Sequence, residues 1–231
     1  MIERIRTSVA LAAVAIGLAA PSLRAQTITS PYRFVETSQS LGVYAGYAKT
    51  GMGALSLGPQ SAPIFGVRYG LRVSGPFSAE ADVSLLSSTR MVWDTIPSDT
   101  ALRNVGEADL RMLTALAALR FDVTGPRTWH GLQPYITLGG GLGFDLAPDA
   151  PAEESVAEDV RFDLGTRFVA LAGGGIEAHF FGRVTARADA RTLLWKLNTP
   201  DPFLLGEPGL YRPADEWTQN VLITGHLAFR F

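Results

Sequence analysis

The chain has 231 residues and no cysteine, and its 20 basic and 22 acidic side chains give a net charge of −2 at neutral pH. Without cysteine the protein has no disulfide framework, no thiolate metal site and no cysteine nucleophile. The balanced charge excludes the strongly basic surface that nucleic acid binding requires, so we expect no nucleic acid partner.

The first 25 residues have the pattern of a cleaved secretory signal. Arg4 and Arg6 form a short basic region, residues 9–20 are an uncharged apolar run, and the small residue Ala25 precedes Gln26. A membrane anchor explains this segment less well, because a spanning helix needs about 20 apolar residues. We therefore predict a signal peptide over residues 1–25, whose removal leaves 231 − 25 = 206 residues, enough for one domain.

The mature sequence alternates apolar and polar residues, which is the period of a strand with two unlike faces. In residues 64–74, for example, Phe65 and Val67 share one face and Arg68 lies on the other. Residues 108–119 also favour a helix by composition, but the strands on either side favour a strand there. Eight strands are predicted, over residues 39–49, 64–74, 77–91, 109–124, 134–146, 162–181, 183–197 and 217–231.

The connections between these strands alternate between long and short. The long ones are rich in proline, glycine or polar side chains and cover residues 50–63, 92–106, 147–161 and 198–216, whereas Ser74-Gly75-Pro76 is a tight turn. An even strand number with long loops on one side only is typical of membrane-spanning barrels. The sequence thus predicts an all-β protein, an eight-stranded antiparallel up-and-down transmembrane β-barrel over residues 39–231. Residues 26–38 show no period and are predicted to be a periplasmic lead-in.

The last predicted strand ends the chain on an aromatic residue. Leu227, Phe229 and Phe231 lie on one face, and His226 and Arg230 lie on the other. Together with the signal peptide, the eight strands and the unequal loops, this ending resembles the small OmpA/OmpX-type barrels of the bacterial outer membrane over residues 39–231.

This resemblance implies several properties of the protein. It implies export through the periplasm and insertion into the outer membrane as a monomer, in contact with outer-membrane lipids and lipopolysaccharide. Leu227, Phe229 and Phe231 would act as the assembly signal for the barrel assembly machinery, after periplasmic chaperones have carried the chain. Full-length OmpA-type proteins carry a periplasmic peptidoglycan-binding domain that this sequence lacks, so we expect no wall-tethering role.

The polar face of the predicted strands collects charges of both signs. An arginine or lysine on the lipid face near the bilayer midplane costs about 2–4 kcal/mol, so these residues should point inward. The inside of an eight-stranded barrel is just wide enough for side chains to fill, which favours a salt-bridged plug, although a rearranging network could also open a narrow path for ions. The predicted interior charge network contains Arg68, Arg72, Glu80, Asp82, Arg120, Asp122, Asp145, Arg167, Glu177, Arg187, Asp189, Arg191 and Arg230.

Two further groups of residues are assigned structural roles. The glycines at 139–141, 143 and 173–175 lie within strands and lack the following Lys-Ser/Thr of a phosphate loop, so they indicate close backbone approach, sharp curvature or room for large inward side chains. Aromatic residues near strand ends are expected to form interfacial girdles. We place Trp93, Phe144, Trp195 and Trp217 at the extracellular end, and Phe77, Phe121, Trp129, Phe180, Phe229 and Phe231 at the periplasmic end.

The sequence predicts no catalytic, cofactor or metal site. Lipid A acyltransferase and deacylase barrels, which share this architecture, carry a catalytic histidine toward the extracellular side. Here His130, His179 and His226 all map to the periplasmic side, and they lack metal-ligand spacing. The acidic loops around Glu153 and Asp215 are interpreted as solvated, because they lack the spacing of a calcium loop.

We therefore expect a non-enzymatic outer-membrane protein with a structural, envelope-integrity or adhesion role carried by its long loops. A narrow channel for small or hydrophobic solutes is the alternative. A soluble lipocalin-like barrel is a third interpretation, but it would leave about a dozen ionic side chains outside and would not explain the terminal phenylalanine.

Overall fold

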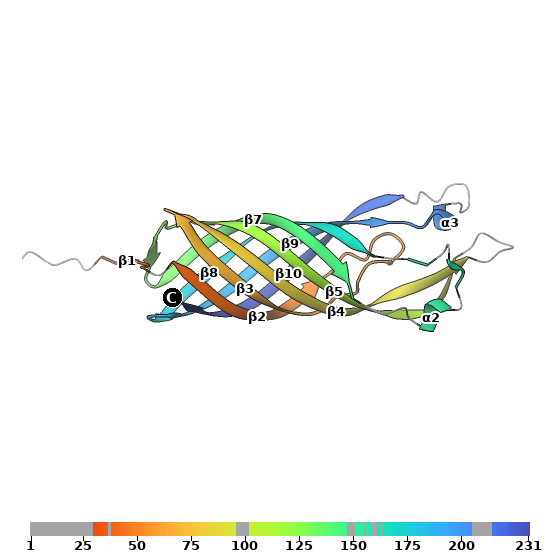
Figure 1. Ribbon diagram of the computed structural model, residues 1–231, viewed down its shortest axis with the longest axis horizontal. Coiled ribbons are helices and arrows are strands. Elements are labelled where there is room, and N and C mark those ends of the chain that lie inside the picture. Colours follow the sequence, from red (N-terminus) through yellow and green to blue (C-terminus); the bar gives the residue numbers. More distant parts are fainter. Residues whose placement is uncertain are drawn as a thin grey trace, which may run out of the picture. The chain divides into compact units, whose positions relative to one another are not determined.

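The computed structural model describes residues 30–36, 38–95, 102–146, 151–154, 156–158, 161–162, 164–204 and 214–231. The chain divides into two compact units, residues 1–30 and 31–231. The predicted signal peptide lies outside the described residues, as do residues 26–29 and 37 of the lead-in. The second unit is a β-barrel (Figure 1). Among the described residues, no helix has the length and apolar character needed to cross a membrane.

Eight long antiparallel strands form the wall of the barrel. They are β2 (Gln39–Lys49), β3 (Ala62–Ser74), β4 (Phe77–Thr95), β5 (Leu102–Asp122), β7 (Leu132–Asp145), β8 (Thr166–Phe181), β9 (Val184–Asn198) and β10 (Asp215–Arg230). Each strand pairs with its neighbours in the chain, and β10 pairs with β2 to close the ring. The predicted eight-stranded up-and-down barrel is confirmed.

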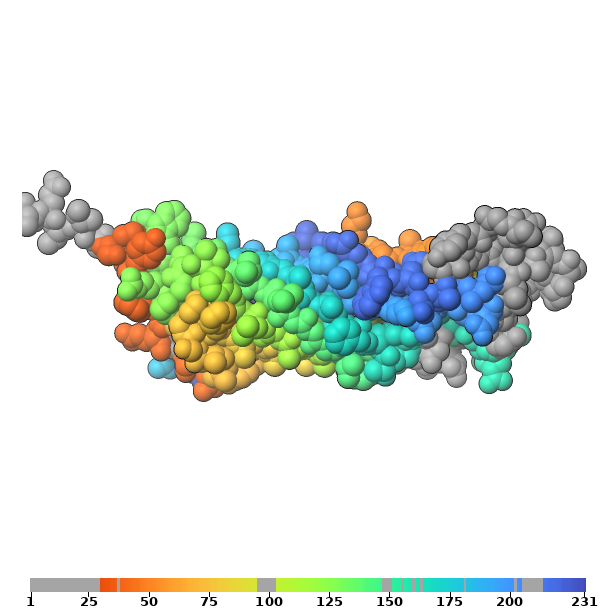
Figure 2. Space-filling view, turned by 90° about the horizontal axis from the view of Figure 1, so that it is seen from above, coloured from red at the N-terminus to blue at the C-terminus, as the bar shows by residue number. Residues whose placement is uncertain are grey.

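The strands are strongly tilted, as the slanting bands of colour in Figure 2 show. The strands are also staggered around the ring. A path that starts at Phe229 on β10 and passes from each residue to its paired residue on the next strand returns to β10 at Gln219, ten residues from the start. A stagger of this size around eight strands belongs to a small barrel whose interior is filled by side chains. Closure therefore leaves little open space in the lumen.

Side chains alternate along every strand between the lumen and the outer surface. On β10, for example, successive residues from Thr218 to Arg230 are buried at even positions and exposed at odd ones. Inward glycines allow the wall to curve, since a Cβ on Gly139 or Gly141 would collide with the backbone of β5. This confirms close backbone approach as the role of these glycines.

The two ends of the barrel differ. At one end the connections are short, and Gly75 and Gly182 adopt the positive φ that tight turns require. At the other end lie the long connections, with α2 (Pro151–Glu154) and α3 (Asp201–Leu204). Here β4 and β5 continue well past the last pairings with their other neighbours, at Leu86 and Met112, and pair only with each other. Much of the predicted loop over residues 92–106 is therefore strand.

Two short strands at the short-turn end were not predicted. β1 (Tyr32–Phe34) lies in the lead-in and pairs with β6 (Arg127–Trp129), which lies in the connection between β5 and β7. Three residues are too few to show a period in the sequence, and the pairing joins segments about a hundred residues apart, so no local signal indicates it. The lead-in is thus attached to the barrel.

Candidate functional site

The lumen at the short-turn half of the barrel is ionic. Ten charged side chains, each at most 7% exposed, point into it from six strands. Five are arginines and five are carboxylates, so their formal charges cancel. They are Arg68, Glu80, Asp82, Arg120, Asp122, Glu177, Arg187, Asp189, Arg191 and Arg230. We call these ten residues the ionic layer.

Glu80 is the centre of the ionic layer. Its carboxylate accepts hydrogen bonds from Arg187 Nη1 at 2.6 Å and from Arg191 Nη2 at 3.0 Å. The guanidinium groups of Arg120 and Arg68 lie 3.7 and 4.0 Å away. Four arginines therefore surround one carboxylate, which compensates for the loss of water around each charge.

Glu177 is a second junction of the layer. Arg120 Nη1 donates to it at 2.5 Å, Arg187 Nε lies 3.0 Å away, and Arg230 Nη1 donates at 3.4 Å. The remaining carboxylates have partners too: Arg68 reaches both Asp82 and Asp189, at 2.8 and 2.9 Å. Because most members have two or more partners, the layer is one connected network.

Two tyrosines complete the network. Tyr44 donates to Asp82 at 2.7 Å and lies under the Arg68 guanidinium, 4.7 Å from the ring centre. Tyr135 donates to Asp189 at 2.9 Å and lies 4.0 Å from Arg120. The ring of Tyr44 fits only because residue 66 is glycine, whose missing Cβ would lie 2.6 Å from ring atom Cε1. Stacking and hydrogen bonding together fix the arginine planes.

Three of the residues predicted for the charge network lie outside the ionic layer. Arg72 lies at the short-turn mouth, where its Nη1 donates to the carbonyl of Val35 in the lead-in at 2.7 Å. Arg167 and Asp145 are half-buried at the long-loop ends of β8 and β7. Arg167 is ten residues along β8 from Glu177, roughly 33 Å at the rise of a strand. Alternation shows that these side chains face inward, but it does not show how far along the barrel axis they lie.

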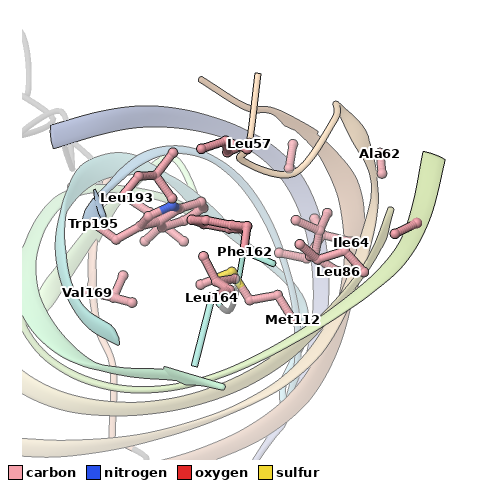
Figure 3. Packing of buried hydrophobic residues seen from close by; sticks show 14 of the residues in the cluster. Leu57, Ala62, Ile64, Leu86, Met112, Phe162, Leu164, Val169, Leu193 and Trp195 are labelled. Atoms are coloured by element: carbon pink, nitrogen blue, oxygen red, sulfur yellow. The ribbon is translucent and has the colours of Figure 1, made fainter. Parts of the chain in front are cut away.

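The lumen at the long-loop half is apolar, which the alternation of charges did not lead us to expect. Leu110, Met112, Leu193 and Leu197 point inward from the wall. The space between them is filled by Phe162 and Leu164 from the β7–β8 connection and by Leu57 from the β2–β3 connection (Figure 3). Phe203 from α3 belongs to the same cluster. We call this cluster the apolar layer. The connections therefore fold into the barrel and do not all extend away from it.

The predicted place of Trp195 in an interfacial girdle is wrong. Trp195 belongs to the apolar layer. It is 2% exposed and lies beside Leu193 in the lumen (Figure 3). The inward positions of β9 change from Arg187 to Leu193 and Trp195. The side chains still alternate between lumen and surface, but polar and apolar residue types no longer alternate over the last residues of the strand. That loss of alternation is the sequence signal for an apolar lumen.

A buried ion pair joins the β7–β8 connection to the barrel wall. Arg90 on β4 is paired with Glu153 of α2, and the guanidinium lies 5.5 Å from the centre of the Phe162 ring. Both side chains are buried, and we call α2 together with the ends of β4 and β5 that extend beyond the barrel the cap. The pair therefore fixes α2 over the apolar layer.

The cavities described inside the lumen are small. The one at the short-turn mouth, beside Glu80 and Arg187, has about 20 Å³, and the one between the two layers, beside Tyr44 and Leu222, has about 10 Å³. A single water needs about 10–15 Å³. Each of these two cavities therefore has room for about one water.

The histidines do not form a catalytic arrangement. His226 is buried, and neither of its ring nitrogens has a hydrogen-bond partner among the described residues. His179 contacts Arg230 and Gln133, at 3.1 and 3.2 Å, and no serine or threonine hydroxyl is hydrogen-bonded to it in the described structure. Three metal-binding side chains do not come together anywhere in the described ranges. In the described structure, His179 and His226 are thus not hydrogen-bonded to a candidate nucleophile.

The outer wall is an apolar belt. From the short turns up to Tyr47, Phe65 and Leu113, the outward side chains of the eight strands carry no charge, and many large aliphatic and aromatic ones are more than half exposed. A shallow groove of about 600 Å³ over β2, β3 and β4 is lined by the same belt. Such a surface requires hydrocarbon around it. The soluble lipocalin-like interpretation is wrong, because the charges lie inside and the apolar face lies outside.

The closed barrel, its inward charges and its apolar belt define an integral β-barrel of the bacterial outer membrane. The chain is similar to the crystal structure of Neisserial surface protein A, with 12% identity, a TM-score of 0.54, and coverage of 84% of this chain and 97% of the other. It is also similar to the outer membrane protein OprG from Pseudomonas aeruginosa, with 11% identity, a TM-score of 0.50 and the same coverage. No protein-family model and no curated protein matches the sequence.

Barrels of this kind have short periplasmic turns and long extracellular loops. We therefore expect the ionic layer to be periplasmic and the apolar layer to be extracellular. Leu227, Phe229 and Phe231 lie on the outer surface of the closing strand, and Phe231 exchanges backbone hydrogen bonds with Gln39 at 3.0 and 3.1 Å. Their role as an assembly signal stays a prediction.

Proposed function

We propose that this protein is a non-enzymatic scaffold of the outer membrane that carries a fixed extracellular surface, with a role in envelope integrity or adhesion. The observation that supports the proposal best is that the lumen is filled by two different layers, one ionic and one apolar. A channel needs a continuous polar path, and an enzyme needs an activated group in a cleft. The two packed layers and the small cavities beside them therefore support a closed, non-catalytic barrel.

The extracellular end supports the same proposal. The β4–β5 ribbon extends beyond the barrel and packs against α2, and the ion pair of Arg90 with Glu153 lies between them. The β2–β3 connection is attached as well, since the backbone N of Ala54 donates to Glu216 of β10 at 2.9 Å. The part of this surface that these contacts hold is ordered before it meets a partner, which lowers the entropic cost of binding.

The test is to refold the mature chain into liposomes and to record single-channel currents from the same preparation. We expect insertion, shown by a heat-modifiable gel mobility, and no discrete conductance. Insertion with steady unitary currents would instead favour the alternative, a narrow channel for small or hydrophobic solutes. A soluble monomer that does not insert would contradict both.

A further inference from the structure

The short strands β1 and β6 form a small sheet at the periplasmic rim, which we call the periplasmic tab. Tyr32 lies opposite Trp129, and Phe34 lies opposite Arg127, so these four side chains share one face. Arg33 and Thr128 are on the other face, and Thr128 is buried against the barrel. The face with the aromatic residues therefore points away from the lumen.

This face continues the apolar belt. Trp129 lies opposite Leu132, an outward residue of β7, so both side chains are on the same side of the sheet. Phe34, Trp129 and Tyr32 are 64%, 49% and 48% exposed. Aromatic side chains of this kind collect where hydrocarbon meets lipid headgroups, since Tyr and Trp combine an apolar ring with a polar group.

The charges around the tab are mainly positive. Arg127 lies 4.5 Å from the centre of the Phe34 ring, and Arg33 and Arg183 are exposed at the same end. Glu36 is the exposed carboxylate side chain described at this end. Lipid phosphates are anionic, so both the aromatic rings and the charge match a phospholipid headgroup layer.

We propose that the periplasmic tab is an interfacial anchor that binds the phospholipid headgroups of the periplasmic leaflet. The proposal rests on the membrane position of the barrel. Its partner is a lipid surface, and the aromatic face would lie in the headgroup region while Arg127, which shares that face, contacts phosphate. The tab thus adds a monotopic contact to a protein whose strands span the membrane.

The anchor has a consequence for the lumen. β1 is attached at the β5–β7 side of the barrel, whereas the chain enters β2 three to four strands away. The described part of the segment before β2 is held at the periplasmic mouth by Arg72, whose Nη1 and backbone N donate to the carbonyls of Val35 and Ser38, both at 2.7 Å. A tab fixed in the headgroup layer would keep this segment over the ionic layer.

Tryptophan fluorescence in brominated phospholipid vesicles tests the proposal. The background protein carries Trp93→Phe, Trp129→Phe and Trp217→Phe and keeps only Trp195, which is buried in the lumen. The test protein carries Trp93→Phe and Trp217→Phe and so retains Trp129. A positive control adds Phe65→Trp to the background, because Phe65 is 60% exposed within the belt. Bromine is placed near the headgroup end or near the methyl end of the acyl chain, and acrylamide is the aqueous quencher.

We expect the emission of Trp129 to fall by at least half with bromine near the headgroup, and to fall less with bromine near the methyl end or with acrylamide. Trp129 quenched by acrylamide but not by bromine, while the Phe65→Trp control is quenched, would overturn the anchor and leave the membrane position intact. Stronger quenching near the methyl end would overturn the headgroup assignment. Absence of quenching in both proteins would overturn the membrane position and the anchor with it.

Discussion

Arg187 Nη1 donates a hydrogen bond to Glu80 Oε1 at 2.6 Å across the full width of the barrel, since β9 and β4 lie four strands apart in a ring of eight. The pair joins residues 107 positions apart in the sequence. It therefore connects opposite walls of the lumen. Arg120 and Arg191 extend the connection to Glu177 and Asp189.

Removal of the charge on Glu80 should strongly destabilise the barrel. Glu80→Gln leaves four buried arginines around a neutral amide, and breaking a buried pair costs about 3–5 kcal/mol. Urea unfolding in detergent micelles or liposomes measures the free energy of unfolding. The matched control is Asp215→Asn, which breaks the exposed pair with Lys196 and should cost less than about 1 kcal/mol. Equal costs for the two variants would contradict a central role for Glu80.

The alternation on β9 predicts opposite results for two adjacent leucines. Leu193 is buried in the apolar layer, whereas Leu194 is 38% exposed on the belt. Leu193→Ala should lower the free energy of unfolding by about 2–5 kcal/mol, because it leaves a cavity. Leu194→Ala should cost less, since lipid fills the space. A larger loss for Leu194→Ala in the same unfolding assay would mean that the faces are reversed.

A methyl group added at Gly66, inside the barrel, should destabilise the protein more than one added at Gly225, outside it. A Cβ at residue 66 would meet the ring of Tyr44, whereas a Cβ at residue 225 would meet nothing within 4 Å. Gly66→Ala should displace Tyr44 and weaken its hydrogen bond to Asp82, and Gly225→Ala should be neutral. If contact with the Tyr44 ring destabilises Gly66→Ala, then Gly66→Ala should lower the free energy of unfolding much less in a Tyr44→Ala background. A double-mutant cycle measures this difference.

The sequence was sufficient to predict the number, order and faces of the strands. The bounds of β2 are the predicted residues 39–49, and the ten members of the ionic layer were all placed inside. The position of each inward side chain along the barrel axis was not predictable, because strand tilt determines which inward residues meet across the lumen. Arg167 and Arg191 share an inward face, yet only Arg191 reaches Glu80. Trp195 was misplaced for the same reason, and β1 has no local pattern.

The ion pair of Arg90 with Glu153 predicts how firmly the extracellular cap is held. Glu153→Gln should release α2 from the β4–β5 ribbon, because Arg90 would keep its charge in a buried position without a carboxylate. Limited proteolysis of intact liposomes should then cut the β7–β8 connection faster. Glu154→Gln, the exposed neighbour, is the control and should leave the rate unchanged. Equal cleavage rates in both variants would show that the pair does not hold the cap.

The closed lumen is the central claim, and the absence of native cysteine allows it to be tested with single cysteines. Ser84 lies in the lumen between the two layers, and Asp109 is exposed on the β4–β5 ribbon. The measurement is the rate at which a charged maleimide labels Ser84→Cys and Asp109→Cys in liposomes. A closed lumen predicts rapid labelling at residue 109 and none at residue 84 until the protein is unfolded. Labelling of residue 84 at a rate close to that of residue 109 would show an open lumen.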